Sequence, residues 1–140
     1  VENFPNQRVG VKDSSFNLFE KLKIENFSLL PGSETKLLKG LQLGCTGIIT
    51  ATTNATASLA REVYDNFQKK KDFNSDKKLC DVRLVFEKFN LVSGLHSFFG
   101  KKNKIYKNML PPLRILSNIE ESELFEGLEL LDFKENNMVS

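Results

Sequence analysis

The chain has 140 residues, of which 40% are hydrophobic and 27% are charged, so it has the composition of a globular protein that can bury one core. Its net charge of +2 is too small to indicate a nucleic-acid partner, and it contains neither a membrane-spanning apolar run nor a signal-peptide pattern, so we expect a cytoplasmic protein. Two cysteines and one histidine exclude a disulfide framework and the usual zinc-ligand spacings.

A short strand is predicted at residues 9–11, and a lysine follows it directly. Val9 and Val11 alternate with small or polar neighbours as in a buried strand, and residues 13–15 (Asp-Ser-Ser) are typical of a turn. Lys12 is therefore expected where a strand ends. A solvated lysine ammonium is a poor nucleophile, whereas desolvation at an apolar strand end favours the neutral amine that forms Schiff bases. With 16 lysines in the chain (20 Lys+Arg minus four Arg), an ordinary solvated charge also fits this pattern.

A short helix over residues 18–22, capped by Asn17, is predicted after this strand, and two more strand and helix pairs are predicted downstream. The expected strands are residues 27–30 and 47–51, and the expected helices are residues 37–44 and 59–67, each with an apolar stripe at helical spacing. Glycine and proline, or threonine and asparagine, lie between strand and helix in each pair, as turns require. Three successive βα units indicate parallel strands beneath a layer of helices.

Beyond residue 70 the hydrophobic pattern is helical throughout. Apolar stripes predict helices over residues 79–89 and 91–98, and the two prolines in residues 110–113 exclude a helix there. A capping box at residues 117–120 predicts the start of a last helix. We therefore divide the chain into residues 1–70, which carry the βα units, and residues 71–140, which are helical.

Four segments resemble one enzyme family in order along the chain. Residues 5–15 (PNQRVGVKDSS) are similar to the Schiff-base strand of the dihydrodipicolinate synthase and N-acetylneuraminate lyase family. Residues 30–34 resemble its glycine turn after the seventh barrel strand, residues 44–54 its eighth strand and following loop, and residues 110–113 its proline-rich segment before the last helix.

The resemblance implies an α/β fold, specifically the carboxyl-terminal part of a (β/α)8 TIM barrel. Residues 1–70 would be the last three βα units, with three parallel strands, and residues 71–140 a helical carboxyl-terminal region. Because a complete barrel of this type needs roughly 250 residues, we expect the chain to be a fragment that lacks the amino-terminal half.

The resemblance also implies a chemistry. In this family a lysine at the end of the sixth strand attacks the keto carbon of pyruvate or a related 2-oxo acid, which makes Lys12 the expected catalytic residue of a class I lyase, aldolase or synthase. Gly32 and the backbone of Ile49 would bind the substrate, with no cofactor or metal. The expected partners are a small-molecule 2-oxo acid and either identical copies or the missing barrel half. Glu34 is a candidate acid or base, although a helix start by itself favours a carboxylate there.

Some family features are missing from this sequence. The Gly-Thr-Thr-Gly-Glu loop that binds the substrate carboxylate and the proton-shuttling tyrosine have no counterpart, Phe16 replaces a usual glycine, and His96 stands where many relatives carry a lysine. We therefore expect the 140 residues alone to be inactive. The alternative hypothesis is a non-catalytic half barrel, an assembly or binding module in which Lys12 is a residual feature and open strand edges pair with another chain.

Overall fold

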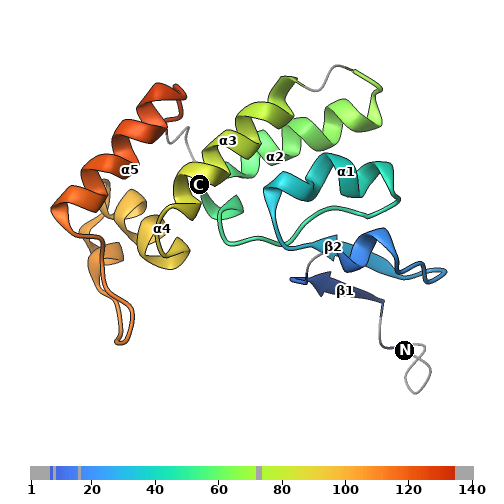
Figure 1. Ribbon diagram of the computed structural model, residues 1–140, viewed down its shortest axis with the longest axis horizontal. Helices are drawn as coiled ribbons and strands as arrows, with labels where there is room; N and C mark the ends of the chain where they lie inside the picture. Colours follow the sequence, from blue (N-terminus) through green and yellow to red (C-terminus); the bar gives the residue numbers. More distant parts are fainter. Residues whose placement is uncertain (1–6, 8, 16, 72–73, 135–140) are drawn as a thin grey trace.

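The computed structural model describes residues 7, 9–15, 17–71 and 74–134. A small sheet lies at one end of an elongated arrangement and a group of helices at the other (Figure 1). In chain order the elements are β1 (Gly10–Asp13), the 3-10 helix η1 (Leu18–Glu20), β2 (Ser28–Pro31), η2 (Glu34–Lys36), α1 (Leu37–Gln42), α2 (Thr53–Gln68), α3 (Asn74–Glu87), α4 (Leu91–Gly100), η3 (Lys104–Lys107) and α5 (Asn118–Leu130). The α/β class and the order of the helices agree with the sequence-based predictions.

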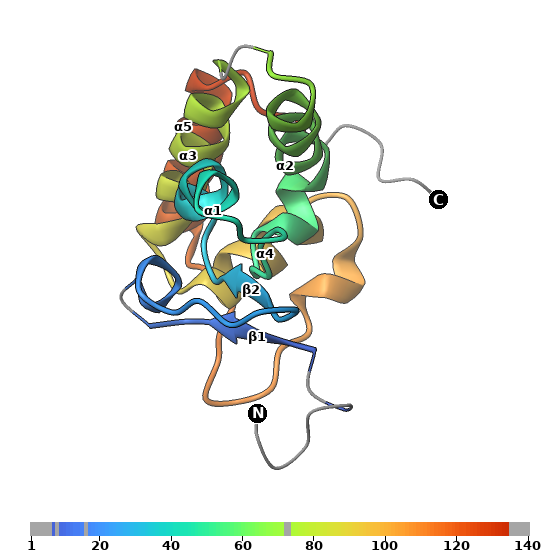
Figure 2. The ribbon, with the colours of Figure 1, turned by 90° about the vertical axis from the view of Figure 1, so that its right-hand side faces the viewer.

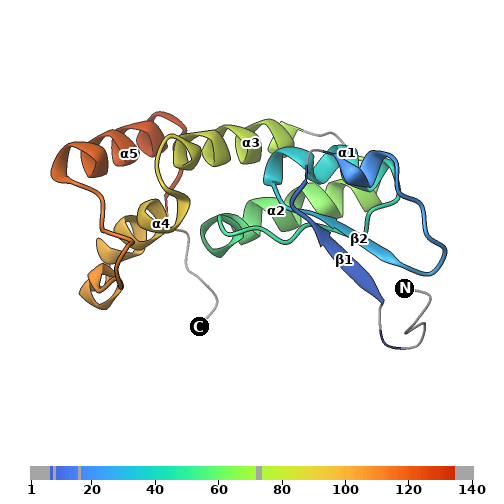
Figure 3. The ribbon, with the colours of Figure 1, turned by 60° about the horizontal axis from the view of Figure 1, so that its bottom comes forward.

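The two strands pair in parallel, with Gly10 opposite Ser28 and Lys12 opposite Leu30 (Figure 3). The backbones approach closely at the start of this pairing. A Cβ atom on Gly10 would lie 2.8 Å from the carbonyl oxygen of Ser28, a distance that no side chain tolerates. Glycine at this position therefore lets β1 and β2 come together.

Helices cover one face of these strands. Leu29 of β2 is 9% exposed and packs with Phe19 of η1 and with Cys45, while Pro31 is buried beneath Gly40 of α1. Figure 2 shows α1, α2 and α3 on the same side of the two strands. Because side chains alternate between the faces of a strand, Lys12 lies on the face opposite the helices.

The predicted third strand at residues 47–51 is not formed, so this part of the prediction is wrong. The segment runs along β2 and makes two backbone hydrogen bonds to it, from Thr46 to Leu29 (3.3 Å) and from Ile49 to Pro31 (3.1 Å). The donors are three residues apart (46 to 49) and the acceptors two (29 to 31). This extra residue breaks the regular ladder that a strand requires.

The prediction that Val9 and Val11 belong to a buried strand is also wrong. Val9 is 71% exposed and Val11 is 37% exposed. In the described part of the chain β1 pairs only with β2, which leaves it as an edge strand. The alternation of valines reports a strand correctly, but burial needs a covering element as well.

Helix α3 joins the two ends of the molecule. Leu79 packs with Leu37, Leu41 and Val63 of α1 and α2, whereas the carboxyl-terminal half of α3 packs with α4 and α5. The capping box predicted at Ser117 is present at the start of α5. No helix among the described residues combines the length and the apolar content that a membrane crossing needs.

Candidate functional site

Lys12 occupies the second-last position of β1, within the strand rather than directly after it but near the strand end, where it was expected. Its side chain is exposed, and no hydrogen bond or ion pair joins it to the other described residues. Within the described part of the chain no helix lies on the face that carries Lys12, and Leu30 is its neighbour on β2. A solvated amine in this setting becomes a nucleophile only when another surface covers the face and removes water.

Gly32 and Ile49 lie next to the carboxyl ends of the strands, as expected for parallel strands that end at one edge. The Gly32 amide donates to the carbonyl oxygen of Asp13 (2.8 Å), and the Ile49 amide donates to that of Pro31 (3.1 Å). These bonds arrange the end of β1, the turn after β2 and the 47–51 segment side by side. Lys12, Gly32 and Ile49 thus come from three neighbouring segments that lie side by side at the carboxyl ends of the strands.

The close approach at Gly32 explains why this position carries glycine. A Cβ atom there would lie 3.0 Å from the Asp13 carbonyl oxygen and 3.3 Å from the Ser14 hydroxyl oxygen. Ile49 is 47% exposed, so its side chain is not part of the core. The backbone amides of Gly32 and Ile49 already donate to carbonyl oxygens of the strand ends. These two residues can therefore offer a ligand only their carbonyl oxygens and their surface.

Asp13 organises the turn that follows Lys12, at residues 13–15 where the sequence predicts a turn. One carboxylate oxygen accepts hydrogen bonds from the amide (2.9 Å) and hydroxyl (2.5 Å) of Ser15, and the other accepts from the Phe19 amide (2.9 Å). Asn17, the expected helix cap, makes no side-chain cap bond. An aspartate followed by two serines is a recognisable signal for such a turn.

The charge of Asp13 is held in place by these contacts. Burial would raise the pKa of Asp13, but the hydrogen bonds from the Ser15 hydroxyl and from the Phe19 and Ser15 amides, together with the charge of Lys36, outweigh it. The net effect is a pKa below the ordinary value of an aspartate. The residue next to Lys12 is therefore a fixed carboxylate at neutral pH.

Glu34 is fully buried and makes structural contacts, so its carboxylate is not exposed at the entrance of a site. Its Oε2 lies 3.1 Å from Nη1 of Arg83 in α3, and its Oε1 accepts from the hydroxyls of Thr50 (2.5 Å) and Thr56 (3.3 Å). Arg83 also donates to the Thr52 hydroxyl (2.7 Å). This cluster ties the turn after β2 to the 47–51 segment and to α3.

Arg83 was overlooked in the sequence, although a signal was available. It lies four residues after Leu79, on the buried stripe of α3, where a charge needs an opposite charge. Asn54 donates to the Ala51 carbonyl at the start of α2, and Nδ1 of His96 lies 2.6 Å from the Tyr106 carbonyl oxygen. Both are engaged in local structure.

Metal binding finds no support in the part of the chain that the structure describes. There, no three side chains of His, Cys, Asp or Glu gather closely enough to hold an ion.

A family model described as the Dihydrodipicolinate synthetase family matches residues 3–123. A curated aldolase for 2-dehydro-3-deoxy-D-gluconate and its phosphate, from Picrophilus torridus, is 27% identical over 112 residues, which cover 74% of this chain and 42% of the relative.

Solved structures give the same picture. A dihydrodipicolinate synthase of Bacillus anthracis superposes with a TM-score of 0.76 at 17% identity, over 86% of this chain and 44% of that one. An N-acetylneuraminate lyase of Proteus mirabilis superposes with a TM-score of 0.72 at 18% identity, over 88% of this chain and 44% of that one. The chain thus spans less than half the length of these relatives, and at such identities the superpositions report a shared fold.

Proposed function

Because this chain belongs to the dihydrodipicolinate synthetase family, we propose that it carries the Schiff-base lysine of a class I lyase, aldolase or synthase that acts on pyruvate or a related 2-oxo acid. Residues 1–70 would supply the last three βα segments of a TIM barrel and residues 71–140 its helical carboxyl-terminal region. An amino-terminal half, on the same chain or on another, would complete the barrel.

The observation that carries this proposal is the position of Lys12. It lies at the carboxyl end of a parallel strand, on the face that no helix covers, and barrel enzymes bind their substrates at the carboxyl ends of the strands. Gly32 and Ile49 lie in the two neighbouring segments of the same edge. A substrate joined to Lys12 would therefore meet the carbonyl oxygens of both residues.

The proposed reaction begins when the neutral amine of Lys12 adds to the keto carbon of the substrate. Loss of water from the resulting carbinolamine gives an imine, and protonation of the imine nitrogen makes it an electron sink for the adjacent carbon. A carbon–carbon bond at that carbon can then form or break. Asp13 would hold the turn beside the lysine, and the residues that bind the carboxylate and move protons would come from the amino-terminal half.

Borohydride trapping tests the assignment of Lys12. Reduction in the presence of pyruvate converts an imine to a stable secondary amine, and peptide mass mapping locates it. In a chain that includes the amino-terminal half, we expect the adduct on Lys12, no adduct in Lys12→Ala, and an unchanged adduct in Lys23→Ala, which removes another exposed lysine. The 140-residue chain should show negligible aldol turnover, because proximity and orientation supply much of an enzyme's rate.

Two results would contradict the proposal. Labelling at a different lysine would move the nucleophile, and turnover by the 140-residue chain equal to that of the longer chain would place the active site elsewhere. Absence of any adduct in the longer chain would favour the second candidate function, a non-catalytic half barrel. The exposed edge strand β1 is the observation that supports this alternative, because a free edge can pair with another chain.

A further inference from the structure

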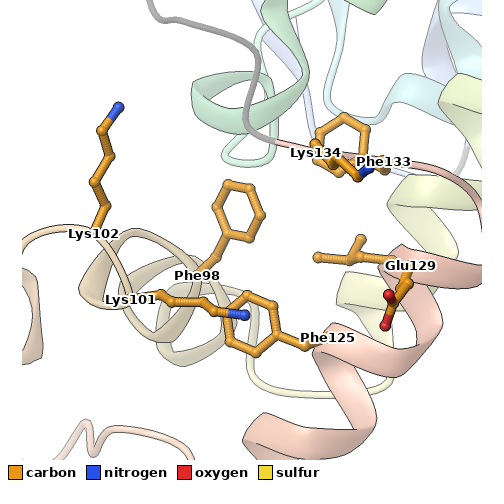
Figure 4. A pocket seen from close by; sticks show the side chains of 8 residues that line it. Phe98, Lys101, Lys102, Phe125, Glu129, Phe133 and Lys134 are labelled. Carbon is orange, nitrogen blue, oxygen red and sulfur yellow. The ribbon is translucent and has the colours of Figure 1, made fainter.

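A cavity of about 440 Å3 lies between α4, α5 and the residues that follow α5, at the end of the molecule away from the sheet (Figure 4). Three phenylalanines line it, one from each of these parts. The ring centroid of Phe98 is 6.2 Å from that of Phe125 and 6.0 Å from that of Phe133, and the ring planes differ by only 23° and 31°. Cavities of this volume accommodate small organic ligands.

The aromatic walls of the cavity are already fixed by the protein core. Phe98 is 6% exposed and also meets Phe86 edge to face at 5.7 Å, and Leu128 beneath it is 1% exposed. An apolar ligand would therefore enter a preformed site rather than order a loose one. A preformed site lowers the entropic cost of binding.

The charges at the rim of the cavity favour an anion. Lys101, Lys102 and Lys134 line the cavity, against the single carboxylate of Glu129. The Lys101 ammonium lies 4.2 Å from the centroid of the Phe125 ring, and neither Lys101 nor Lys102 has an ion-pair partner among the described residues. Lys134 lies 3.8 Å from the carboxylate of Asp132, and both side chains are largely exposed.

The charges are also separated in space. Figure 4 shows Lys102 on one side of the Phe98 ring and Glu129 on the other, with the Lys101 ammonium between them in front of Phe125. A negatively charged ligand group would lie beside the Lys101 ammonium, whereas the Lys102 side chain extends away from the rings. The apolar body of the ligand would then extend over the phenylalanine rings.

We propose that this cavity is a binding site for a small aromatic carboxylate, with the ring system among Phe98, Phe125 and Phe133 and the carboxylate beside Lys101. None of these residues lies at the carboxyl ends of the strands, where Lys12 lies. The site is therefore independent of the function proposed above.

Titration of 2-naphthoate into the 140-residue chain, followed by calorimetry and amide NMR shifts, tests this site. We expect one saturable site with shifts confined to α4, α5 and the residues after α5, and weaker binding of the neutral 2-naphthylmethanol. Lys101→Gln should weaken 2-naphthoate binding roughly fivefold, as the loss of one partly exposed charge pair predicts, and Glu129→Gln should strengthen it by a similar factor. Lys69→Gln, at an exposed lysine after α2, is the matched control and should change nothing.

These opposite signs make the result decisive. Equal affinity for 2-naphthoate and 2-naphthylmethanol would overturn the role of the lysines. Equal effects of Lys101→Gln and Lys69→Gln, or shifts located outside α4 and α5, would overturn the location. Absence of saturable binding at millimolar 2-naphthoate would overturn the site as a whole.

Discussion

Asp13 links the end of β1 to the turn that follows Lys12, and its charge state matters for that link. Its pKa is lowered in the folded chain, so the ionised form is the one that the fold stabilises. A carboxyl group with a lowered pKa stabilises the fold above its unfolded pKa of about 3.9, and this contribution is lost as the pH falls through the folded-state pKa. The turn beside Lys12 should therefore loosen in acid.

Asp13→Asn tests this expectation. At pH 7 the variant should lose about 1–2 kcal/mol of unfolding free energy, because hydrogen bonds to a charged group are replaced by weaker ones. The difference from the parent chain should shrink as the pH falls from about 4 toward the lowered pKa of the folded parent, because the parent's carboxylate is progressively protonated there. Urea unfolding at several pH values measures it. Asp132→Asn, at an exposed aspartate, is the control, and a difference that stays constant with pH would contradict the assignment.

Sequence reasoning predicts Lys12 as the catalytic residue because a strand end and a family motif coincide there. It predicts the turn at residues 13–15 but misses the contact of Asp13 with Phe19 and the role of Arg83, because these depend on partners that the fold brings together. Asp13 needs the Phe19 amide, six residues away, and Arg83 needs Glu34, 49 residues away. A single residue type at one position reports a local preference, whereas a partner at that separation is not encoded in any local pattern.

At the scale of elements, the Glu34–Arg83 pair joins the turn after β2 to α3 through the interior. Both side chains are almost completely removed from water, at 0% and 8% exposure. Removal of Arg83 would leave the buried Glu34 carboxylate without an opposite charge, whereas removal of Glu34 would leave Arg83 its second partner, Glu87 at 2.8 Å. An uncompensated buried charge is far more costly than replacement of both partners.

A double-mutant cycle separates these effects. Arg83→Met should lower the unfolding free energy by about 3–5 kcal/mol, Glu34→Gln should lower it by less because Arg83 keeps its pair with Glu87, and the double variant should lose less than the sum of the two. Urea unfolding followed by circular dichroism gives the three values. Lys77→Gln, which breaks an exposed ion pair with Asp81 within α3, should have little effect. Additive losses would show that Glu34 and Arg83 do not interact.

The helices were more predictable than the strands, for a physical reason. The apolar stripe of α2 and the capping box of α5 are local signals that a helix can satisfy by itself. A strand also needs neighbours to complete its ladder. The 47–51 segment has the β-branched composition of a strand, but its irregular pairing with β2 leaves it without a regular ladder.

For the whole molecule, the sheet end presents an open strand edge and apolar side chains to water. Val9 and Ile49 are 71% and 47% exposed, and β1 presents an open edge in the described part of the chain. Open strand edges with apolar side chains promote pairing between chains. We therefore expect the 140-residue chain to associate with itself as its concentration rises.

Light scattering coupled to size-exclusion chromatography measures this association. Val9→Lys should shift the chain toward the monomer, because a charge beside the edge strand opposes pairing. Ile119→Lys, at a 74% exposed residue on α5, alters an equally exposed apolar side chain far from the sheet and should leave association unchanged. A parent chain that stays monomeric at all concentrations would contradict the expectation.

The buried pair between Glu34 and Arg83 also has a consequence for the order of folding events. Its partners are 49 residues apart, so the ion pair forms only after the chain has folded back to bring α3 against the turn after β2. Closure of a loop of that size is entropically unfavourable early in folding, when few contacts reward it. The pair should therefore be absent from the folding transition state, so that it would lower the unfolding rate rather than raise the folding rate.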